Sequence, residues 1–280
     1  MLKKSVVLLS AVLVTLGVVR ADDRPFLFCD PVKSTFCGVS SIYEFEESAD
    51  YARTSEVGGP RFLEPDGADV NASAPTHKTG ATSLAIDASA NHYVYIPRSS
   101  GPSGQFTVGF WIYPFGLPSA TTKRVQILST RDALGNEGYP RVYLYNNAGT
   151  VNVRYEVKQG ITDTVTTLTN TSQAIALNNW YYVTFGQYPN ADSTHPYQHT
   201  LWIQTNGGTR DTANITNGDV ATVGDFIIGG WLGTSPTEYG YYRLDQFASW
   251  SGTFSTTDSG RLYNAGAGCA FPFVATATGC

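Results

Sequence analysis

The sequence has few charged residues and few of the residues that build long helices. Of its 280 residues, 15% are charged and 42% are hydrophobic, and a single Met stands beside 28 Gly and 17 Tyr. These fractions exclude an intrinsically disordered chain and a coiled coil. Long helices need many Ala, Leu, Glu and Lys residues, whereas Tyr favours strands and Gly favours turns. The composition therefore predicts an all-β protein.

Long hydrophobic runs are also scarce, and the clearest one lies at the start of the chain. Lys3 and Lys4 precede an apolar run over residues 6–19, and Val19–Ala21 has short residues where a signal peptidase reads the chain. A membrane-spanning helix, the alternative, needs about 20 apolar residues. This run is shorter and is interrupted by Ser and Thr. We predict a signal peptide over residues 1–21, a secreted, extracellular chain and no membrane span.

Basic residues are a minority, more so once the predicted signal peptide is removed. Residues 1–21 hold three of the 18 basic residues and none of the 23 acidic residues, which leaves a net charge of −8. Nucleic acids and anionic lipids are bound through Lys and Arg. The charge therefore disfavours both as partners and leaves neutral and cationic partners open.

Cysteine is rare, and its four copies lie near the two ends of the mature chain. An exported chain with an even number of cysteines usually oxidises them, so we predict two disulfides. Three pairings are open, from local loops to bridges between the termini. A zinc site is disfavoured because no Cys-x-x-Cys pair exists and no His adjoins a Cys. The cysteines are Cys29, Cys37, Cys269 and Cys280.

Segments in which apolar and polar residues alternate recur along the chain, as in strands with one buried and one solvent-exposed face. Asn146–Gly149 and Asn206–Gly208 follow such segments and predict hairpin turns, because Asn and Gly accept a positive φ. One face of residues 106–113 is fully apolar, and the other carries Thr107, Gly109, Trp111 and Tyr113. The clearest segments are 41–45, 83–87, 92–96, 106–113, 125–129, 141–145, 151–157, 180–187, 200–204, 226–229 and 241–250.

One short helix is predicted near the end of the chain. Ser255–Asp258 resembles a capping box, and Gly266 can stop the helix. Residues 49–79 have little periodicity and predict a long surface loop, or a strand plus loop. We expect one domain whose core lies between two packed sheets. The predicted parts are the signal peptide 1–21, a Cys-bearing segment 22–39, the domain 40–268 and a Cys-bearing tail 269–280.

The order of several short motifs resembles that of the concanavalin A-like superfamily, in particular its laminin G-type, pentraxin-like branch. The resemblance covers roughly residues 40–268. It implies a jelly-roll sandwich of two curved antiparallel sheets and a role in recognition, often of glycans. The matching segments are Tyr43–Glu47, Ser83–Asp87, Tyr93–Pro97, Phe106–Ile112, Asn179–Phe185, Thr200–Ile203, Phe226–Gly230, Tyr242–Trp250 and Leu262–Gly266.

Motifs for catalysis are missing, so we do not expect an enzyme. Glucanases of this superfamily place acids at alternate positions of one strand, and the nearest pattern, Glu44–Glu47, fits an exposed polar face. No Gly-x-Ser-x-Gly motif is present. We predict that His195–His199 forms a surface loop beside a strand, because Pro196 prevents a regular helix. The other histidines, His77 and His92, also fall in loop or edge contexts.

The resemblance also implies calcium as a cofactor, held by loop oxygen atoms. Residues 130–138 are similar to a pentraxin loop with an Asp-Asn pair, whereas residues 231–240 keep only Glu238 of the second loop. We therefore expect the two-calcium pentraxin site to be absent. A single calcium site that uses Asp132, Asn136 or Glu238 stays open, with solvated turn acids as the alternative.

Glycan recognition needs a solvent-facing aromatic ring with polar neighbours. The candidate cluster is Trp231, Tyr239 and Tyr241 with Asn136 and Asp132, and sheet or loop packing is the alternative explanation for these rings. Three Asn-x-Ser/Thr sequons are candidate glycosylation sites if the source is eukaryotic. They begin at Asn71, Asn170 and Asn214.

Two functions from different classes follow from these features. The first is a secreted, non-enzymatic module that binds glycans or proteins at a cell surface or in the extracellular matrix. The alternative is a structural subunit that self-associates into an extracellular coat, sheath or filament, braced by its Cys-bearing ends. A diverged hydrolase is disfavoured because the family's catalytic acids are missing.

Overall fold

A computed structural model describes most of the chain between residues 39 and 268. The predicted signal peptide, the four cysteines and Asn71 lie outside the described residues, as do Trp231, Tyr239, Asp132 and Asn136. The described ranges are 39–43, 78–79, 83–86, 93–96, 105–131, 137–159, 164–171, 173–189, 197–205, 211–218, 225–229, 237–238, 240–250 and 256–268.

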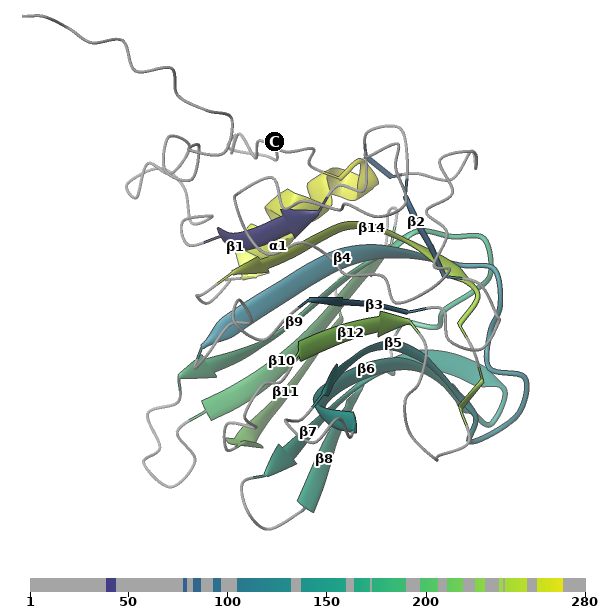
Figure 1. The fold of residues 1–280 in the computed structure, drawn as a ribbon, viewed down its shortest axis with the longest axis horizontal. Coiled ribbons are helices and arrows are strands. Elements are labelled where there is room, and N and C mark those ends of the chain that lie inside the picture. Colours follow the sequence, from purple (N-terminus) through teal and green to yellow (C-terminus); the bar gives the residue numbers. More distant parts are fainter. Residues whose placement is uncertain are drawn as a thin grey trace, which may run out of the picture.

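The strands form two seven-stranded sheets (Figure 1). The order in the first sheet is β1-β14-β4-β9-β10-β11, and β2 pairs with β14 on the side of this path. All its strand pairs are antiparallel. Its strands are β1 (Val39–Tyr43), β2 (Leu84–Ile86), β4 (Phe106–Pro114), β9 (Tyr181–Pro189), β10 (Tyr197–Thr205), β11 (Asp211–Gly218) and β14 (Tyr242–Trp250).

The second sheet has the order β3-β12-β5-β6-β7-β8. Its pairs are antiparallel except that β13 (Thr237–Glu238) runs parallel to β5. One short helix, α1 (Thr256–Tyr263), and a 3-10 turn over Asn264–Gly266 follow the last strand. The predicted all-β two-sheet sandwich with a short C-terminal helix is thus confirmed. The other strands are β3 (Tyr93–Ile96), β5 (Arg124–Arg131), β6 (Glu137–Asn147), β7 (Thr150–Gln159), β8 (Thr164–Thr169) and β12 (Asp225–Gly229).

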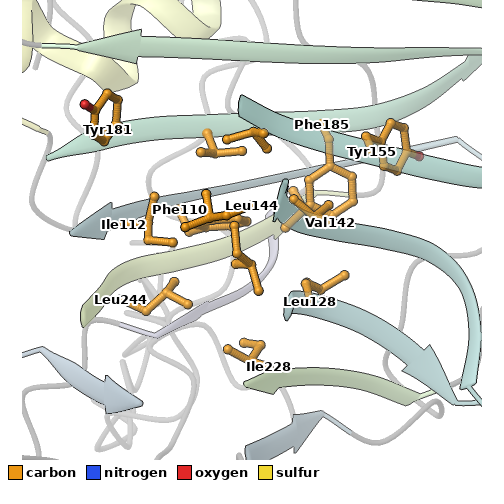
Figure 2. Packing of buried hydrophobic residues seen from close by; sticks show 14 of the residues in the cluster. Phe110, Ile112, Leu128, Val142, Leu144, Tyr155, Tyr181, Phe185, Ile228 and Leu244 are labelled. Carbon is orange, nitrogen blue, oxygen red and sulfur yellow. The ribbon is translucent and has the colours of Figure 1, made fainter. Parts of the chain in front are cut away.

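The main core lies between the two sheets and is built from alternate residues of each strand. The apolar face predicted for residues 106–113 is confirmed: Phe106, Val108, Phe110 and Ile112 are all at most 1% exposed. Rings and branched side chains from both sheets meet there, with Phe110 stacked on Phe247 at 6.0 Å between ring centroids. Figure 2 shows part of this cluster. Each fully buried side chain of this kind stabilises the fold by roughly 1.5–3 kcal/mol.

The predicted hairpin at Asn146–Gly149 joins β6 and β7. Ala148 and Gly149 have φ values of 51° and 95°, as a tight turn between antiparallel strands requires. The Asn146 side chain holds the turn, because its Oδ1 accepts the Gly149 N–H at 2.8 Å and its Nδ2 donates to the Pro118 carbonyl at 3.0 Å. The antiparallel pairing of β10 with β11 confirms the second hairpin, whose turn lies outside the described residues.

Strand β14 contains a β-bulge that changes which of its residues face the core. The pairing with β4 moves three residues along β14, from Asp245 to Ala248, while it moves two along β4. Gln246 takes up the extra residue with φ 49°. Leu244 and Phe247 consequently both reach the main core, whereas Ala248 belongs to a cluster on the opposite face.

The outer face of the first sheet is buried, and the expectation of one solvent-exposed face is wrong for these strands. Trp111 is 0% exposed and stacks on Tyr263, which ends α1, at 5.6 Å between ring centroids. The Thr184 and Ser259 hydroxyls also meet at 3.2 Å between β9 and α1. The helix therefore packs on this face and helps to bury a second apolar cluster. Its members are Trp111, Tyr182, Tyr188, Trp202, Ala248, Trp250, Leu262 and Tyr263.

One further expectation differs from the structure. His199 does not lie in a surface loop: it belongs to β10, is buried, and its Nδ1 lies 3.1 Å from the Tyr155 hydroxyl of β7. Residues 78–79 lie in a bend, in keeping with the predicted loop, and this bend is held against the first sheet because both backbone N–H groups donate to Asp245 Oδ2 at 2.6 and 2.9 Å. Among the described ranges, no helix is long and apolar enough to cross a membrane.

Candidate binding surfaces

Three half-buried aromatic rings and one exposed ring gather where β4 ends and where β9 and β14 begin. We call Tyr113, Phe115, Trp180 and Tyr241 the aromatic rim. Successive ring centroids lie 5.1 Å apart for Tyr241 and Phe115, 5.1 Å for Phe115 and Tyr113, and 5.3 Å for Tyr113 and Trp180. Tyr241 is 41% exposed, so an aromatic side chain faces solvent at this end of the sandwich.

Backbone hydrogen bonds hold the rim in place. The N–H groups of Phe115 and Gly116 both donate to the Tyr241 carbonyl at 2.9 Å. A Cβ at Gly116 would lie 3.3 Å from the Tyr241 Cβ, so the two segments approach closely. The rim side chains thus sit on a backbone fixed by the first sheet, which limits the conformational entropy lost when a ligand binds.

Polar groups border the rim. Asn178 and Asn179 precede Trp180 and are exposed. The Asn178 N–H donates to the Pro114 carbonyl at 2.9 Å, which joins this turn to the end of β4. The guanidinium of Arg243, itself largely buried, lies 5.4 Å from the Phe115 ring centroid. The rim therefore combines ring faces with amide groups that can exchange hydrogen bonds with hydroxyls.

The predicted glycan-binding cluster is only partly within the described residues. Of its members, Tyr241 is described and is exposed, as the prediction requires. Trp231, Tyr239, Asn136 and Asp132 lie outside the described residues and stay predictions. Sequence reasoning missed Tyr113, Phe115 and Trp180, because strand pairing joins their separate segments: Tyr113 pairs with Arg243, and Ile112 pairs with Tyr181.

Of the residues predicted to bind calcium, only Glu238 has a described backbone, and it pairs with Val125 near the start of β5. Six residues of extended chain, roughly 20 Å, separate this position from Arg131 at the end of that strand. Asp132 and Asn136 lie outside the described residues, so a single calcium site that uses one of the three residues stays a prediction. Within the described ranges, no three His, Cys, Asp or Glu side chains are grouped to hold a metal ion.

Of the three sequons, only the Asn170 side chain is described. Asn170 is 1% exposed, its Oδ1 accepts the Gln173 N–H at 3.0 Å, and its Nδ2 is enclosed without a hydrogen-bond partner. A glycan attaches to that nitrogen, so occupancy would require this turn to open. Asn214 lies in β11, paired with Thr200.

The outer face of the second sheet carries a different set of side chains, which we call the arginine face. In β6 and β7 the inward positions are apolar, and the residues between them point to the opposite side of the sheet. These outward residues, with the first residue of β5, include three arginines, three tyrosines and one glutamate. The arginine face consists of Arg124, Tyr139, Arg141, Tyr143, Tyr145, Arg154 and Glu156.

Glu156 is the acceptor at the centre of this face. The Tyr143 hydroxyl donates to its Oε1, and Nη1 atoms of Arg124 and Arg141 lie 3.8 and 3.9 Å from its Oε2. Burial first, and then the nearby Glu156 charge, raises the pKa of Tyr143, which keeps the phenol protonated as a donor. The arginines also lie over rings: Arg154 is 3.3 Å from the Tyr145 centroid, and Arg141 is 4.1 Å from that of Tyr139.

Comparison with known proteins finds solved structures of similar fold but no matching family. No family model matches the chain, and no curated protein matches it. Similar solved structures include the receptor-binding domain of botulinum neurotoxin mosaic serotype C/D, with 14% identity, a TM-score of 0.55, and 79% of this chain and 49% of that chain covered. The receptor-binding domain of botulinum neurotoxin D is also similar, with 12% identity, a TM-score of 0.54, and 79% of this chain and 51% of that chain covered.

A Trypanosoma rangeli sialidase in complex with 2,3-difluorosialic acid is also similar, with 11% identity, a TM-score of 0.50, and 79% of this chain and 32% of that chain covered. The chain therefore spans about half of the toxin chains and a third of the sialidase. At these identities the likeness concerns the fold alone, a β-sandwich of two sheets. Because the similar structures include binding domains and an enzyme, they carry no argument about catalysis.

Proposed function

We propose that this chain is a secreted, non-enzymatic recognition module of the laminin G type that binds glycans at the aromatic rim. The observation that carries the proposal is the exposed Tyr241 ring, held against Phe115 by a fixed backbone. The receptor-binding role named for the similar toxin domains supports a binding function for this fold.

The chemistry of the rim suits a sugar better than a fully apolar ligand. The C–H face of a pyranose packs on an aromatic ring, while its hydroxyls need donors and acceptors at the edge of the ring. Tyr241 and Trp180 supply ring surface, and the exposed Asn178 and Asn179 supply amide groups beside it. A short run of two or three sugar units matches the spacing of these rings.

The test is a titration of neutral oligosaccharides against the wild type and two rim variants. Tyr241→Ala and Trp180→Ala should each weaken binding about three- to tenfold, which corresponds to the contribution of one aromatic contact. Tyr241→Phe should retain most of the affinity because it keeps the ring. Val165→Ala is the control, since Val165 is also 41% exposed but lies in β8 of the second sheet.

Two outcomes would count against the proposal. Equal binding by the wild type and both rim variants would show that the rim is not the site. A native mass far above that of one chain, together with no glycan binding, would favour the alternative of self-assembly into an extracellular structure. Release of reducing sugar ends from the oligosaccharides would contradict the non-enzymatic role.

A further inference from the structure

We propose that the arginine face is a second binding site, which takes the carboxylate or sulfate group of an acidic glycan, with Arg154 as its main anion ligand. This site lies on the outer face of the second sheet, whereas the aromatic rim belongs to the first sheet. The proposal therefore stands or falls independently of the function proposed for the rim.

The register of three strands brings the cations together. Arg154 of β7 pairs with Tyr143, Glu156 pairs with Arg141, and Arg124 of β5 pairs with Tyr145. Among the described side chains, three guanidinium groups thus surround one carboxylate, in a chain whose net charge is −5. Charges more than about 8 Å apart are largely screened at physiological salt, so a ligand on this face encounters the local excess of positive charge.

The three arginines do not have the same partners. Glu156 lies within 4 Å of both Arg124 and Arg141. Among the described residues, no carboxylate lies within ion-pair distance of Arg154, whose Nε has no hydrogen-bond partner. Arg154 is therefore the cation whose charge the protein itself leaves least compensated.

Arg154 is also held in place before any ligand arrives. Its guanidinium lies 3.3 Å from the Tyr145 ring centroid, and it stands beside the Tyr143 hydroxyl. A stacked, planar guanidinium can bind both oxygens of a carboxylate or sulfate at once. Partial burial strengthens such a contact, because the effective dielectric constant falls below that of water. Arg124 and Glu156 side chains are only 17% and 13% exposed.

Glu156 selects the kind of anion. A carboxylate close to the bound group repels a second negative charge, but it accepts hydrogen bonds from hydroxyls. A sugar acid or sugar sulfate carries hydroxyls within a few ångströms of its single anionic group. This pairing of one anion with neighbouring donors distinguishes an acidic glycan from a polyphosphate chain, in which each neighbouring group is another anion.

The experiment compares matched ligands on the intact protein. The probes are galacturonate oligosaccharides and their carboxyl-reduced form, and chondroitin sulfate oligosaccharides and their desulfated form. The wild type should bind at least one acidic member at least tenfold more tightly than its uncharged counterpart. Whichever acidic member binds identifies carboxylate or sulfate as the source of the anion.

Arg154→Gln should weaken the binding of that acidic ligand about tenfold or more, as expected for loss of a charge-assisted bidentate contact. Arg154→Lys should give an intermediate loss, because it keeps the charge and removes the planar fork. Lys123→Gln is the matched control: it removes the same charge one residue before β5 and should change affinity less than twofold. Thermal unfolding of each variant checks that the fold is retained.

Several outcomes would overturn the proposal. Equal weakening by Lys123→Gln and Arg154→Gln would show a general charge effect, and equal affinity for an oligonucleotide of the same charge would show an unspecific polyanion surface. Absence of binding by every acidic probe would also overturn it. If Tyr241→Ala abolishes acidic-glycan binding while Arg154→Gln does not, the rim is the only site and the arginine face is not one.

Discussion

The two sheets have seven strands each, but their outer faces differ in composition and in burial. On the first sheet, Trp111, Trp202 and Trp250 are buried outside the sandwich, under a cover that includes α1. On the second sheet, the outward positions hold arginines, tyrosines and Glu156: Glu156 pairs with Arg124, Arg141 and the buried Tyr143, while the Nε atom of Arg154 has no partner among the described residues. Strand alternation therefore sets which residues point outward, while the cover available from the rest of the chain determines whether those residues are buried.

The difference has an energetic side. Burial of large rings contributes several kcal/mol for each side chain, whereas partly exposed ion pairs contribute about 0–1 kcal/mol. The first outer face should therefore act mainly in stability, and the second should be free to act in recognition. Four measurements test this contrast between the two outer faces.

The largest effect is expected for Trp111→Ala. Trp111 contacts Tyr182, Tyr263 and Trp180 at 5.1, 5.6 and 6.5 Å between ring centroids. Loss of this fully buried ring should lower the free energy of unfolding by about 3–5 kcal/mol, measured by urea denaturation. The matched variant Tyr145→Ala on the second outer face should cost about 1 kcal/mol. Equal losses would remove the contrast between the two faces.

The next largest effect is expected when the pH is lowered, because His199 is buried beside Tyr155 of the main core. Burial lowers the pKa of His199 to about 4, from 6.5, so the folded protein keeps this imidazole neutral. Between pH 6.5 and pH 4 the unfolded chain binds a proton that the folded chain does not. Stability is therefore full above pH 6.5 and falls as the pH drops, by about 3 kcal/mol across this window.

The variant His199→Gln isolates this effect from the titration of carboxylates. Its free energy of unfolding should depend less on pH between 6.5 and 4 than that of the wild type, whatever its absolute stability. Parallel pH profiles for the two proteins would mean that His199 is charged or hydrated in the folded state.

A smaller effect is expected for Asp245→Ala. Asp245 is fully buried in β14, and its Oδ2 accepts the backbone N–H groups of Lys78 and Thr79. Removal of the carboxylate leaves these donors without that acceptor, which should cost about 2 kcal/mol. Asp245→Asn keeps an acceptor and should lose about half as much. Hydrogen exchange at the Lys78 and Thr79 amides should accelerate in the Ala variant, and unchanged exchange would mean that this contact does not hold the segment.

The smallest effect is expected for Glu156→Gln on the second outer face. Its ion pairs with Arg124 and Arg141 are 3.8 and 3.9 Å long and partly exposed, so loss of the charge should cost at most about 1 kcal/mol. The cost should shrink further at high salt, as thermal unfolding at two ionic strengths can show. If Glu156→Gln lowered the free energy of unfolding as much as Trp111→Ala, the arginine face would contribute mainly to stability.

Much of the fold was predictable because alternation of apolar residues marks strands that have a buried face. Strands β8 and β11 were missed since they lie at the edges of their sheets and are rich in Thr and Asn, as in Thr164–Thr169. Their place depends on pairing with β7 and β10 rather than on an apolar face. His199 was misplaced because Pro196 suggested a loop, whereas β10 begins at the next residue.

The binding surfaces were less predictable than the strands. Tyr241 could be identified as an aromatic residue beside a strand end, but the rim depends on pairing between segments more than 60 residues apart. Part of the arginine face is visible in the sequence, because Arg141, Tyr143 and Tyr145 alternate with apolar residues in β6 and must therefore share one face of the strand. What sequence could not supply was the register that sets Arg154 beside Tyr143.

The bulge at Gln246 gives β14 one residue more than its pairing with β4 requires. It is the extra residue that lets Leu244 and Phe247 share the inner face and sends Ala248 and Trp250 to the outer one. Deletion of Gln246 would therefore remove the bulge and leave a regularly alternating strand, with Phe247 still facing the space between the sheets and Trp250 still facing outward. A single missing codon at this position would keep inside and outside in place, whereas a β-branched residue at position 246 would be strained by the φ of 49°.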